Sequence, residues 1–280
     1  MLSYQHAYHA GNFADVLKHI VLVQVLKYLK TKDKPLCYLD THAGSGIYKL
    51  INSEAQKNRE YLNGIGKLWQ REDLPACAVD YVNLIKQFNQ SGQLTCYPGS
   101  PLLASQLLSD KDRLFLYELH TAESRQLSDS VKKDKCIKIF RADGLKDSLG
   151  LLPPKEHRGL ILIDPSYEIK NEYQTVVDTL KEMTKRFANG CYLLWYPVVA
   201  RKRNRYMERA LQASGIKNIQ LFELGMQADS EEFGMTACGM ITINPPWTLL
   251  ADMKLTLPWL AEVLGENQQG FYRMEQLVGE

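Results

Sequence analysis

Short apolar runs that alternate with stretches of helical spacing constrain the fold of this chain most strongly. Seven runs have the length and apolar content of buried strands: residues 36–40, 113–119, 136–140, 160–164, 191–197, 218–224 and 235–243. Helical stretches lie between several of them, for example at 172–186 and 204–214. Strands that alternate with helices predict an α/β fold with a seven-stranded, mostly parallel sheet.

Helix start signals precede two of the strands. Asn12 can cap a helix that begins at Phe13 and ends before Lys34-Pro35, and its wide apolar stripe predicts that other elements cover most of it. Ser100 followed by Pro101 is typical of an N-cap and the first helical position. We therefore expect a helix directly before the strand at 113–119.

Four of the predicted strands end in an acidic residue. These are Asp40, which leads into a glycine turn containing Gly44, and then Glu118, Asp143 and Asp164. Because the carboxyl ends of parallel strands meet at one edge of a sheet, the four side chains should converge on one crevice. Acidic residues at strand ends are also common helix caps, so any single one has a simpler explanation.

The crevice lacks the signature of a phosphate site. Neither G-x-x-x-x-G-K-[ST] nor a true G-x-G-x-x-G is present. Glu118 suits the two hydroxyls of a ribose, and Asp143 suits an exocyclic amino group. A nucleoside ligand without a pyrophosphate fits this set, and S-adenosylmethionine is the common one.

One interval in the chain is too long for a simple dinucleotide-type fold. The acidic residue on the second strand normally follows the glycine turn by about 20 residues, whereas Glu118 follows Asp40 by 78 positions. The extra chain has helical periodicity at 58–69 and 75–89. We therefore expect an inserted helical subdomain at 48–98, between two parts of one domain at 1–47 and 99–280.

The residues after the strand at 160–164 predict methyl transfer to an amino group. Asp164, Pro165, Ser166 and Tyr167 are similar to the [DNS]-P-P-[YFW] motif of methyltransferases that modify exocyclic amines. A carboxylate and a backbone carbonyl at this point can hold the amino hydrogens, and Tyr167 can stack on a flipped base. A second copy at 244–247 follows a strand expected to be antiparallel, so it should lie at the opposite edge.

With these motifs together, the chain resembles the bacterial family of 23S ribosomal RNA adenine-N6 methyltransferases that carry a helical insertion in a Rossmann-like class I domain. The resemblance covers essentially the whole length. It is most specific at residues 3–12, 15–19, 38–46 and 97–101. The family's second motif proline is Ser166 here, which leaves the loop geometry open.

The resemblance also implies roles for individual residues. It implies S-adenosylmethionine contacts from His19, His42, Ser100, Glu118, Asp143, Gly144 and Asp164, and Gly44 of the glycine turn, where the backbone can approach a ligand closely, completes the predicted cofactor set. It further implies that Asp164, with Pro165 and Tyr167, acts on the target amino group, with Lys18 and His6 in the active site and Tyr4 on the RNA.

Charge gives only local evidence for an RNA partner. The net charge is +2, so no global basic field is present. Arg201, Lys202, Arg203 and Arg205 follow the strand at 191–197 and can either hold phosphates or be a solvated face. A second candidate surface lies in the insertion, with Lys57, Arg59, Lys67, Arg71 and a stacking Trp69.

Other features set the remaining expectations. Six scattered cysteines without a CxxC pair indicate reduced thiols, and no apolar run is long enough to cross a membrane, so we expect a cytoplasmic protein. His6, His9 and His19 lack the spacing of a zinc site, so we expect no metal. We expect a monomer that acts on protein-free 23S rRNA or an early assembly intermediate.

Two other functions stay open at this point. A DNA adenine methyltransferase would share the catalytic motif, but it normally needs a target-recognition domain for which no sizeable segment remains. A noncatalytic nucleic-acid-binding protein on a methyltransferase fold would have no need for Asp164 and Tyr167.

Overall fold

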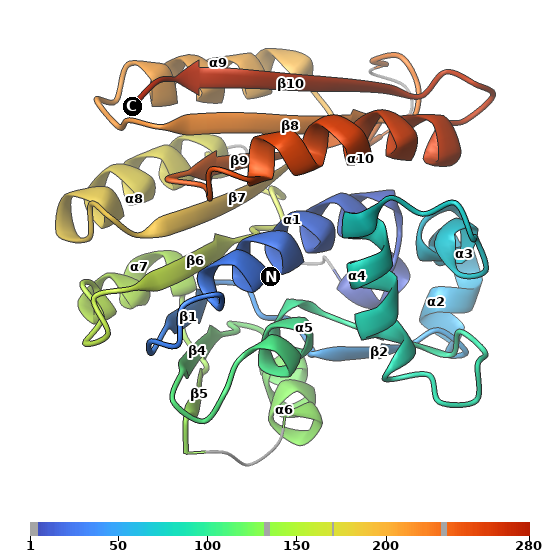
Figure 1. Cartoon of the computed structure of the whole chain (residues 1–280), viewed down its shortest axis with the longest axis horizontal. Helices are drawn as coiled ribbons and strands as arrows, with labels where there is room; N and C mark the ends of the chain where they lie inside the picture. The colour runs from blue at the N-terminus through green and yellow to red at the C-terminus, as the bar shows by residue number, and fades with distance from the viewer. Residues whose placement is uncertain (1–4, 132–134, 170, 231–233) are drawn as a thin grey trace.

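A computed structural model describes residues 5–131, 135–169, 171–230 and 234–280, and it contains one large sheet of eight strands. The order across the sheet is β10-β8-β9-β7-β6-β1-β4-β5 (Figure 1). The strands are β1 (Cys37–Asp40), β4 (Arg113–Tyr117), β5 (Ile137–Phe140), β6 (Gly159–Ile163), β7 (Cys191–Val198), β8 (Ile219–Gly225), β9 (Ala237–Ile243) and β10 (Phe271–Val278). The neighbouring strands β7, β6, β1, β4 and β5 pair in parallel, whereas β9 is antiparallel to both of its neighbours, β7 and β8.

The seven predicted strands are confirmed, but the predicted strand count is wrong because β10 is an eighth strand. β10 pairs antiparallel with β8 at the edge of the sheet. It has no apolar run, because this edge strand is only partly buried and carries Arg273 and Glu275. A search for buried runs therefore passes over it.

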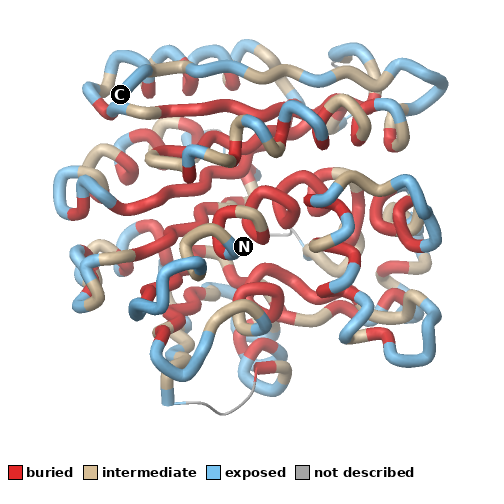
Figure 2. Tube along the Cα trace, in the orientation of Figure 1, coloured by how far each residue is buried: buried red, intermediate tan, exposed pale blue. Residues whose placement is uncertain are grey.

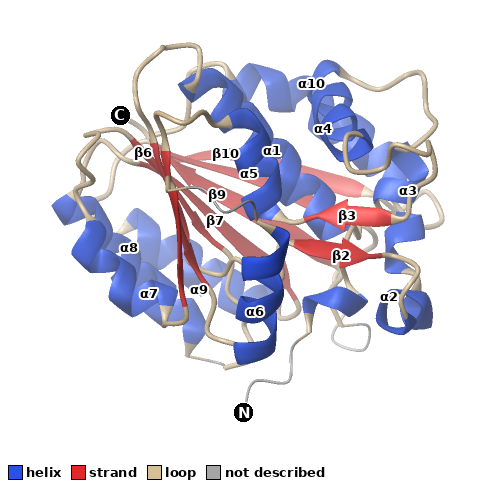
Figure 3. Ribbon diagram, turned by 90° about the horizontal axis from the view of Figure 1, so that it is seen from below, coloured by secondary structure: helices blue, strands red, loops and turns tan. Residues whose placement is uncertain are grey.

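Helices cover both faces of the sheet (Figure 3). One layer contains α1 (Phe13–Leu29), α5 (Ser100–Leu107) and α10 (Leu249–Leu264), and the other contains α6 (Thr121–Ser130), α7 (Gly144–Asp147), α8 (Glu172–Arg186) and α9 (Arg201–Gln212). The central strands are buried between these layers (Figure 2). Helices on both faces explain why the parallel strands have continuous apolar runs rather than alternating ones.

Helix α1 begins as the sequence predicts and is almost completely buried. The Asn12 side chain accepts hydrogen bonds from the backbone N–H groups of Ala14 and Asp15, at 3.0 and 3.1 Å. The helix packs against β7 and β9 on one side and against α4 (Ala76–Lys86) and α5 on the other. Its burial includes the ionisable residues Lys18 and His19, which must therefore be paired or neutral.

The start of α5 differs by one residue from the prediction. Gly99 is the N-cap, and Ser100 is the first helical residue. Because Ser100 is not the cap, its hydroxyl is available to donate a hydrogen bond to Asp40 Oδ2 at 2.7 Å. The residue thus connects α5 to the end of β1.

Residues 47–98 leave the sheet after β1 and return to it before α5. They form β2 (Ile47–Lys49), α2 (Ser53–Asn58), a 3-10 turn (Glu60–Asn63), α3 (Ile65–Leu68), α4 and β3 (Cys96–Pro98). The predicted helical content is present, and the two short strands pair antiparallel where the segment leaves and returns. This closure supports our proposal that 48–98 is an insertion between 1–47 and 99–280.

The insertion reaches the N-terminus of α1 by a close backbone approach at Gly64. A Cβ at Gly64 would lie 2.1 Å from the Gly11 carbonyl oxygen and 2.5 Å from the Asn12 carbonyl carbon. We therefore predict that Gly64→Ala lowers the free energy of unfolding by about 2 kcal/mol, measured by urea denaturation, because the backbones must move apart. Gly150→Ala is the control, since nothing lies within 4 Å of its Cβ. Equal stability of the two variants would contradict this close approach.

Candidate active site

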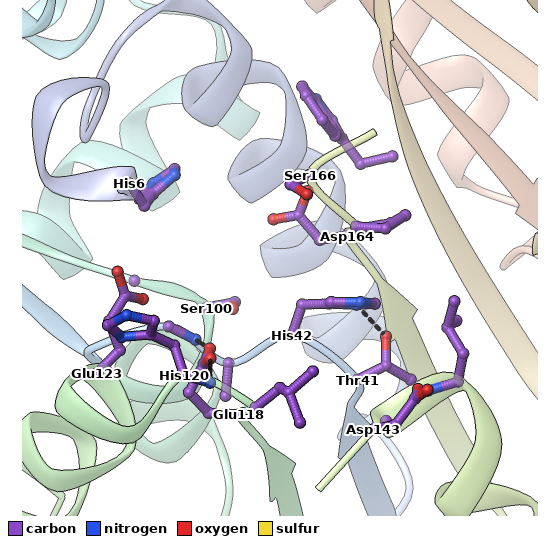
Figure 4. A pocket seen from close by; sticks show the side chains of 18 of the residues that line it. His6, Thr41, His42, Ser100, Glu118, His120, Glu123, Asp143, Asp164 and Ser166 are labelled. Carbon is purple, nitrogen blue, oxygen red and sulfur yellow. Dashed lines mark hydrogen bonds between the residues drawn. The ribbon is translucent and has the colours of Figure 1, made fainter. Parts of the chain in front are cut away.

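Two cavities meet beside Asp164 at the carboxyl ends of the central strands. The first has a volume of about 730 Å³ and the second about 240 Å³. Both are lined by His6, Lys18, Asp164, Ser166 and Trp195. All eight residues that were predicted to contact S-adenosylmethionine line the first cavity, and Figure 4 labels several of them. A carboxylate therefore lies where a ligand in one cavity would face a ligand in the other.

Three of the four acidic strand ends line the first cavity: Glu118, Asp143 and Asp164. Asp40 does not line it, because its side chain is completely buried below the glycine turn. Asp40 accepts hydrogen bonds from Tyr38 Oη at 2.8 Å, from Ser100 Oγ and from the His42 backbone N–H. Burial raises the pKa of Asp40 to about 6. The prediction that all four acids line one crevice is thus wrong for Asp40, which supports the turn from below.

Glu118 is held with both carboxylate oxygens fixed. Oε2 accepts from the Gly44 backbone N–H at 2.9 Å, and Oε1 accepts from the His120 backbone N–H at 2.7 Å. Burial raises the pKa of Glu118. The glycine turn and the end of β4 are thus joined, and the carboxylate has a fixed orientation at the cavity wall.

Asp143 has both of the roles considered from the sequence, a helix cap and a carboxylate that faces the cavity. It caps α7 by accepting from the Leu145 backbone N–H at 3.0 Å, and it also lines the first cavity. The next residue, Gly144, packs against the backbone just after β1, where a Cβ would lie 2.1 Å from the Thr41 carbonyl oxygen. The cap therefore fixes where the Asp143 carboxylate lies.

Two histidines of the first cavity are neutral near physiological pH. Burial lowers the pKa of His19 to about 3 and that of His42 to about 4. His42 Nδ1 lies 2.8 Å from Thr41 Oγ1, and His19 Nδ1 lies 2.6 Å from Tyr97 Oη. Both imidazoles can thus serve as hydrogen-bonding groups in the cavity without a positive charge.

Two ion pairs connect Asp164 to α1, and a histidine hydrogen bond extends them. Lys18 Nζ lies 2.5 Å from Asp164 Oδ2 and 2.8 Å from Asp15 Oδ1, and His6 Nε2 lies 2.9 Å from Asp15 Oδ2. The Lys18 and Asp15 side chains are almost fully buried, and Asp164 is 15% exposed. The network places one ammonium between two carboxylates, close to the junction of the cavities.

The charges in this network stabilise one another. Burial alone would lower the pKa of Lys18, but the carboxylates of Asp15 and Asp164 outweigh it and raise the pKa well above its ordinary value. Burial would raise the pKa of Asp15, but His6 and Lys18 outweigh it and hold the pKa well below its ordinary value. Lys18 is thus a permanent cation beside Asp164. Asp15 was not predicted as a site residue, because its only signal in the sequence is its spacing of three from Lys18 on an apolar helix.

Aromatic side chains form the walls of the second cavity. Tyr167 is only 8% exposed, its hydroxyl donates to the Trp195 carbonyl oxygen at 2.9 Å, and its ring centroid lies 4.5 Å from that of Tyr173. Pro165 lines the first cavity, and Ser166 lines both. Trp195 was not predicted as a site residue, because within its apolar run nothing distinguishes it from a core residue.

The predicted basic cluster on α9 has mixed surroundings. Arg201 pairs with the buried Glu223 and with Asp229, each at 2.7 Å. Arg203 lines the second cavity, whereas Lys202 and Arg205 are exposed. Tyr4, the other predicted RNA contact, lies outside the described residues.

The second basic surface, in the insertion, does not have the predicted stacking residue. Trp69 is only 8% exposed, and its indole N–H donates to the Gly92 carbonyl oxygen. Arg71 is paired with Asp73, and Lys67 donates to the Leu264 carbonyl oxygen. The expectation that Trp69 can stack on RNA is wrong, because the ring is packed inside the insertion.

The second copy of the motif lies at the opposite edge of the sheet, as predicted. Asn244 follows the antiparallel β9, and its amide donates to the carbonyl oxygens of Ala188 and Gly190 before β7. Trp247 is 79% exposed. Antiparallel chain direction thus separates these residues from both cavities.

Residues 5–131, 135–169, 171–230 and 234–280 include no group of three His, Cys, Asp or Glu side chains placed to hold a metal ion. Within the same ranges, every helix is too short or too polar to span a bilayer.

The topology and the cavity together define the class of the protein. A parallel set of strands, an antiparallel strand (β9) inserted between β7 and β8, and a cavity lined by acids at the carboxyl ends are the arrangement of class I methyltransferases.

Comparison with known proteins gives the family. The model of the family described as "Ribosomal RNA large subunit methyltransferase D, RlmJ" matches residues 33–278, and the chain belongs to this family. It is 49% identical over 280 residues to "Ribosomal RNA large subunit methyltransferase J" of Escherichia coli strain K12, and 47% identical over 281 residues to the protein of the same name from Haemophilus influenzae. Both comparisons cover all of each chain. A crystal structure of a Legionella pneumophila protein is 41% identical, covers 96% of this chain and 98% of its own, and superposes with a TM-score of 0.89.

The neutral state of His19 predicts a pH dependence of stability. Its pKa is lower in the folded protein than in the unfolded chain, so the unfolded chain binds the proton first as the pH falls below about 6.5. Stability is therefore full above this pH and is lost towards lower pH. Between pH 7 and pH 5, we predict that the free energy of unfolding, measured by urea denaturation, falls by about 2 kcal/mol less in His19→Gln than in the original protein. His157→Asn, at an exposed position, is the control, and equal losses in all three proteins would contradict a buried neutral His19.

Proposed function

We propose that this protein transfers the methyl group of S-adenosylmethionine to N6 of an adenine in 23S ribosomal RNA. The observation that carries the proposal is the position of Asp164 between two cavities, one suited to a nucleoside cofactor and one to a single base. The printed names of the relatives, large-subunit ribosomal RNA methyltransferases, support the choice of substrate.

The residues of the first cavity fit S-adenosylmethionine. A volume of about 730 Å³ is within the usual range for ligand sites. The buried His19 Nε2 has no hydrogen-bond partner among the described residues, so it is available to a ligand. We assign the cofactor to His19, His42, Gly44, Ser100, Glu118, Asp143, Gly144 and Asp164. When bound, the cofactor supplies an electrophilic methyl group on a positively charged sulfur.

Asp164 and Pro165 would act on the target amino group. The lone pair of an adenine amino group is delocalised into the ring, so the nitrogen is a weak nucleophile. The Asp164 carboxylate and the Pro165 carbonyl can accept its two hydrogens and orient it for in-line attack. Lys18 pairs with Asp164 Oδ2, so Oδ1 would be the oxygen that accepts from the substrate. His6 acts on this arrangement through Asp15.

The second cavity would hold the target base. Its volume of about 240 Å³ and its aromatic walls, Tyr167 and Trp195, suit one base that has left its stack. Tyr4 and the cluster on α9 would hold the neighbouring RNA. Because Arg201 already has two carboxylate partners, we place the phosphate contacts mainly on Lys202, Arg203 and Arg205.

We further propose that a monomer in the cytoplasm acts on protein-free 23S rRNA or on an early assembly intermediate. A cavity that takes a single extruded base needs an RNA segment whose base can leave its helix. Ribosomal proteins bound around the target would restrict this movement.

A methyl-transfer assay tests the proposed function. Labelled methyl from S-adenosylmethionine should pass to protein-free 23S rRNA and be recovered as N6-methyladenosine. Intact large subunits and duplex DNA, measured in parallel, should accept much less. Label found only in DNA would contradict the RNA assignment, and RNA binding without transfer would indicate a noncatalytic binding protein.

Removing the charge of Asp164 should abolish transfer. We predict that Asp164→Asn lowers the rate of methyl transfer by a factor of about 100 or more, because an amide replaces the acceptor carboxylate. The exposed Asp178→Asn on α8 is the matched control. An Asp164→Asn variant with full activity would show that another group receives the amino hydrogens.

The α9 cluster makes a prediction about salt dependence. Arg203→Gln should weaken RNA binding, because one phosphate loses its partner. It should also reduce the slope of log affinity against log salt concentration by about 1, the change expected for one phosphate contact. Arg209→Gln, exposed near the end of the same helix, should leave the slope unchanged. If the two variants bind alike, Arg203 belongs to a solvated face.

A further inference from the structure

A buried chain of three hydrogen-bonding side chains connects the insertion to the first cavity. Tyr81 on α4 lies with its hydroxyl 2.8 Å from that of Tyr97 on β3, and Tyr97 Oη lies 2.6 Å from His19 Nδ1 on α1. All three side chains are at most 1% exposed. Of these three side chains, His19 alone lines the first cavity.

The requirements of the two hydroxyl groups fix the direction of this chain. Tyr81 Oη has Tyr97 as its hydrogen-bond partner, and the described residues offer it no other. A buried hydroxyl hydrogen without an acceptor is costly, so Tyr81 donates to Tyr97. Tyr97 must then donate its own hydrogen to His19 Nδ1. In the reverse direction the Tyr81 hydrogen would have no acceptor.

The direction of the chain determines the tautomer of His19. A neutral imidazole carries one hydrogen, and because Nδ1 accepts from Tyr97, the hydrogen must be on Nε2. Burial keeps the ring neutral, with a pKa of about 3. Nε2 is buried without a hydrogen-bond partner in the described part of the chain. A ligand in the cavity therefore meets a donor at this position and not an acceptor.

The charges around the cavity indicate which ligand atom this donor meets. Glu118 and Asp143, at the ends of β4 and β5, would repel an anionic group. His19, on α1, presents an uncharged Nε2–H that has no partner in the described part of the chain, whereas the Lys18 ammonium beside it is already paired with Asp15 and Asp164. The carboxylate of the amino-acid part is the only anionic group of S-adenosylmethionine, so it belongs at the α1 side of the cavity.

We propose that Tyr97 is a positioning residue, directed by Tyr81, that holds His19 with its Nε2–H towards the carboxylate of the methyl donor. The inference rests on the proposed function for the identity of the ligand. It also gives the insertion a role in cofactor affinity, because Tyr81 belongs to α4 and Tyr97 to β3. Neither tyrosine touches the cofactor.

The tautomer can be measured in the unmodified protein. Nitrogen-15 NMR of labelled histidine distinguishes a protonated from an unprotonated ring nitrogen. We expect His19, assigned by its loss in His19→Gln, to be protonated at Nε2 and unprotonated at Nδ1. Protonation at Nδ1 would overturn the proposal without any need for a tyrosine variant to fold.

Calorimetric binding of two ligands tests the consequence. S-adenosylhomocysteine has the amino-acid carboxylate, whereas 5′-methylthioadenosine does not. We expect Tyr97→Phe to weaken binding of S-adenosylhomocysteine about tenfold, the effect of one hydrogen bond to a charged group, and to leave 5′-methylthioadenosine unchanged. Tyr81→Phe leaves the Tyr97 donor in place and should weaken S-adenosylhomocysteine less than threefold.

Tyr192→Phe is the matched control, since this buried tyrosine donates only to backbone carbonyl oxygens of Met183 and Phe187 and does not line the cavity. Equal losses for both ligands in Tyr97→Phe, or no loss for either, would overturn the role of Tyr97. Failure of the unmodified protein to bind S-adenosylhomocysteine at all would instead contradict the proposed function. The two failures are therefore distinguishable.

Discussion

The ion pair between Lys18 and Asp164 is the interaction on which the site depends. It connects a helix from the first thirty residues to the end of a central strand, and Asp15 on the same helix supplies the second carboxylate that a buried ammonium needs. Removal of Lys18 would leave the Asp164 carboxylate without its ion-pair partner, whereas removal of either carboxylate would leave the buried ammonium with one partner instead of two. The burial of α1 against the sheet, the cap at Asn12 and the close contact of the insertion at Gly64 all fix where Lys18 lies.

In the first cavity, too, buried polar partners fix the side chains that face the ligand. Asp40 lies below the glycine turn and orients Ser100 and His42. The backbone N–H groups of Gly44 and His120 hold the Glu118 carboxylate. Asp143 is held by its role as the N-cap of α7. Tyr97 and Tyr81 do the same for His19. Preorganised partners of this kind reduce the cost of ordering side chains when a ligand binds.

Patterns local in sequence predicted much of the fold and part of the site. Seven strands, the capped start of α1 and the opposite position of the second motif follow from apolar runs, cap chemistry and chain direction. The edge strand β10 was missed because an exposed edge needs no apolar run. Asp15, Trp195 and the tyrosine chain were missed because their roles arise from contacts between segments distant in sequence. Trp69 was misjudged because periodicity does not show which face of a short helix is covered.

The claim that Asp164 stands between a cofactor cavity and a base cavity is tested most directly by a crystal structure with S-adenosylhomocysteine and adenosine monophosphate bound. We predict the adenine in the second cavity, with its amino nitrogen within hydrogen-bond distance of Asp164 and facing the sulfur in the first cavity. An adenine bound away from Asp164, for example beside Asn244 and Trp247 at the opposite edge of the sheet, would contradict it.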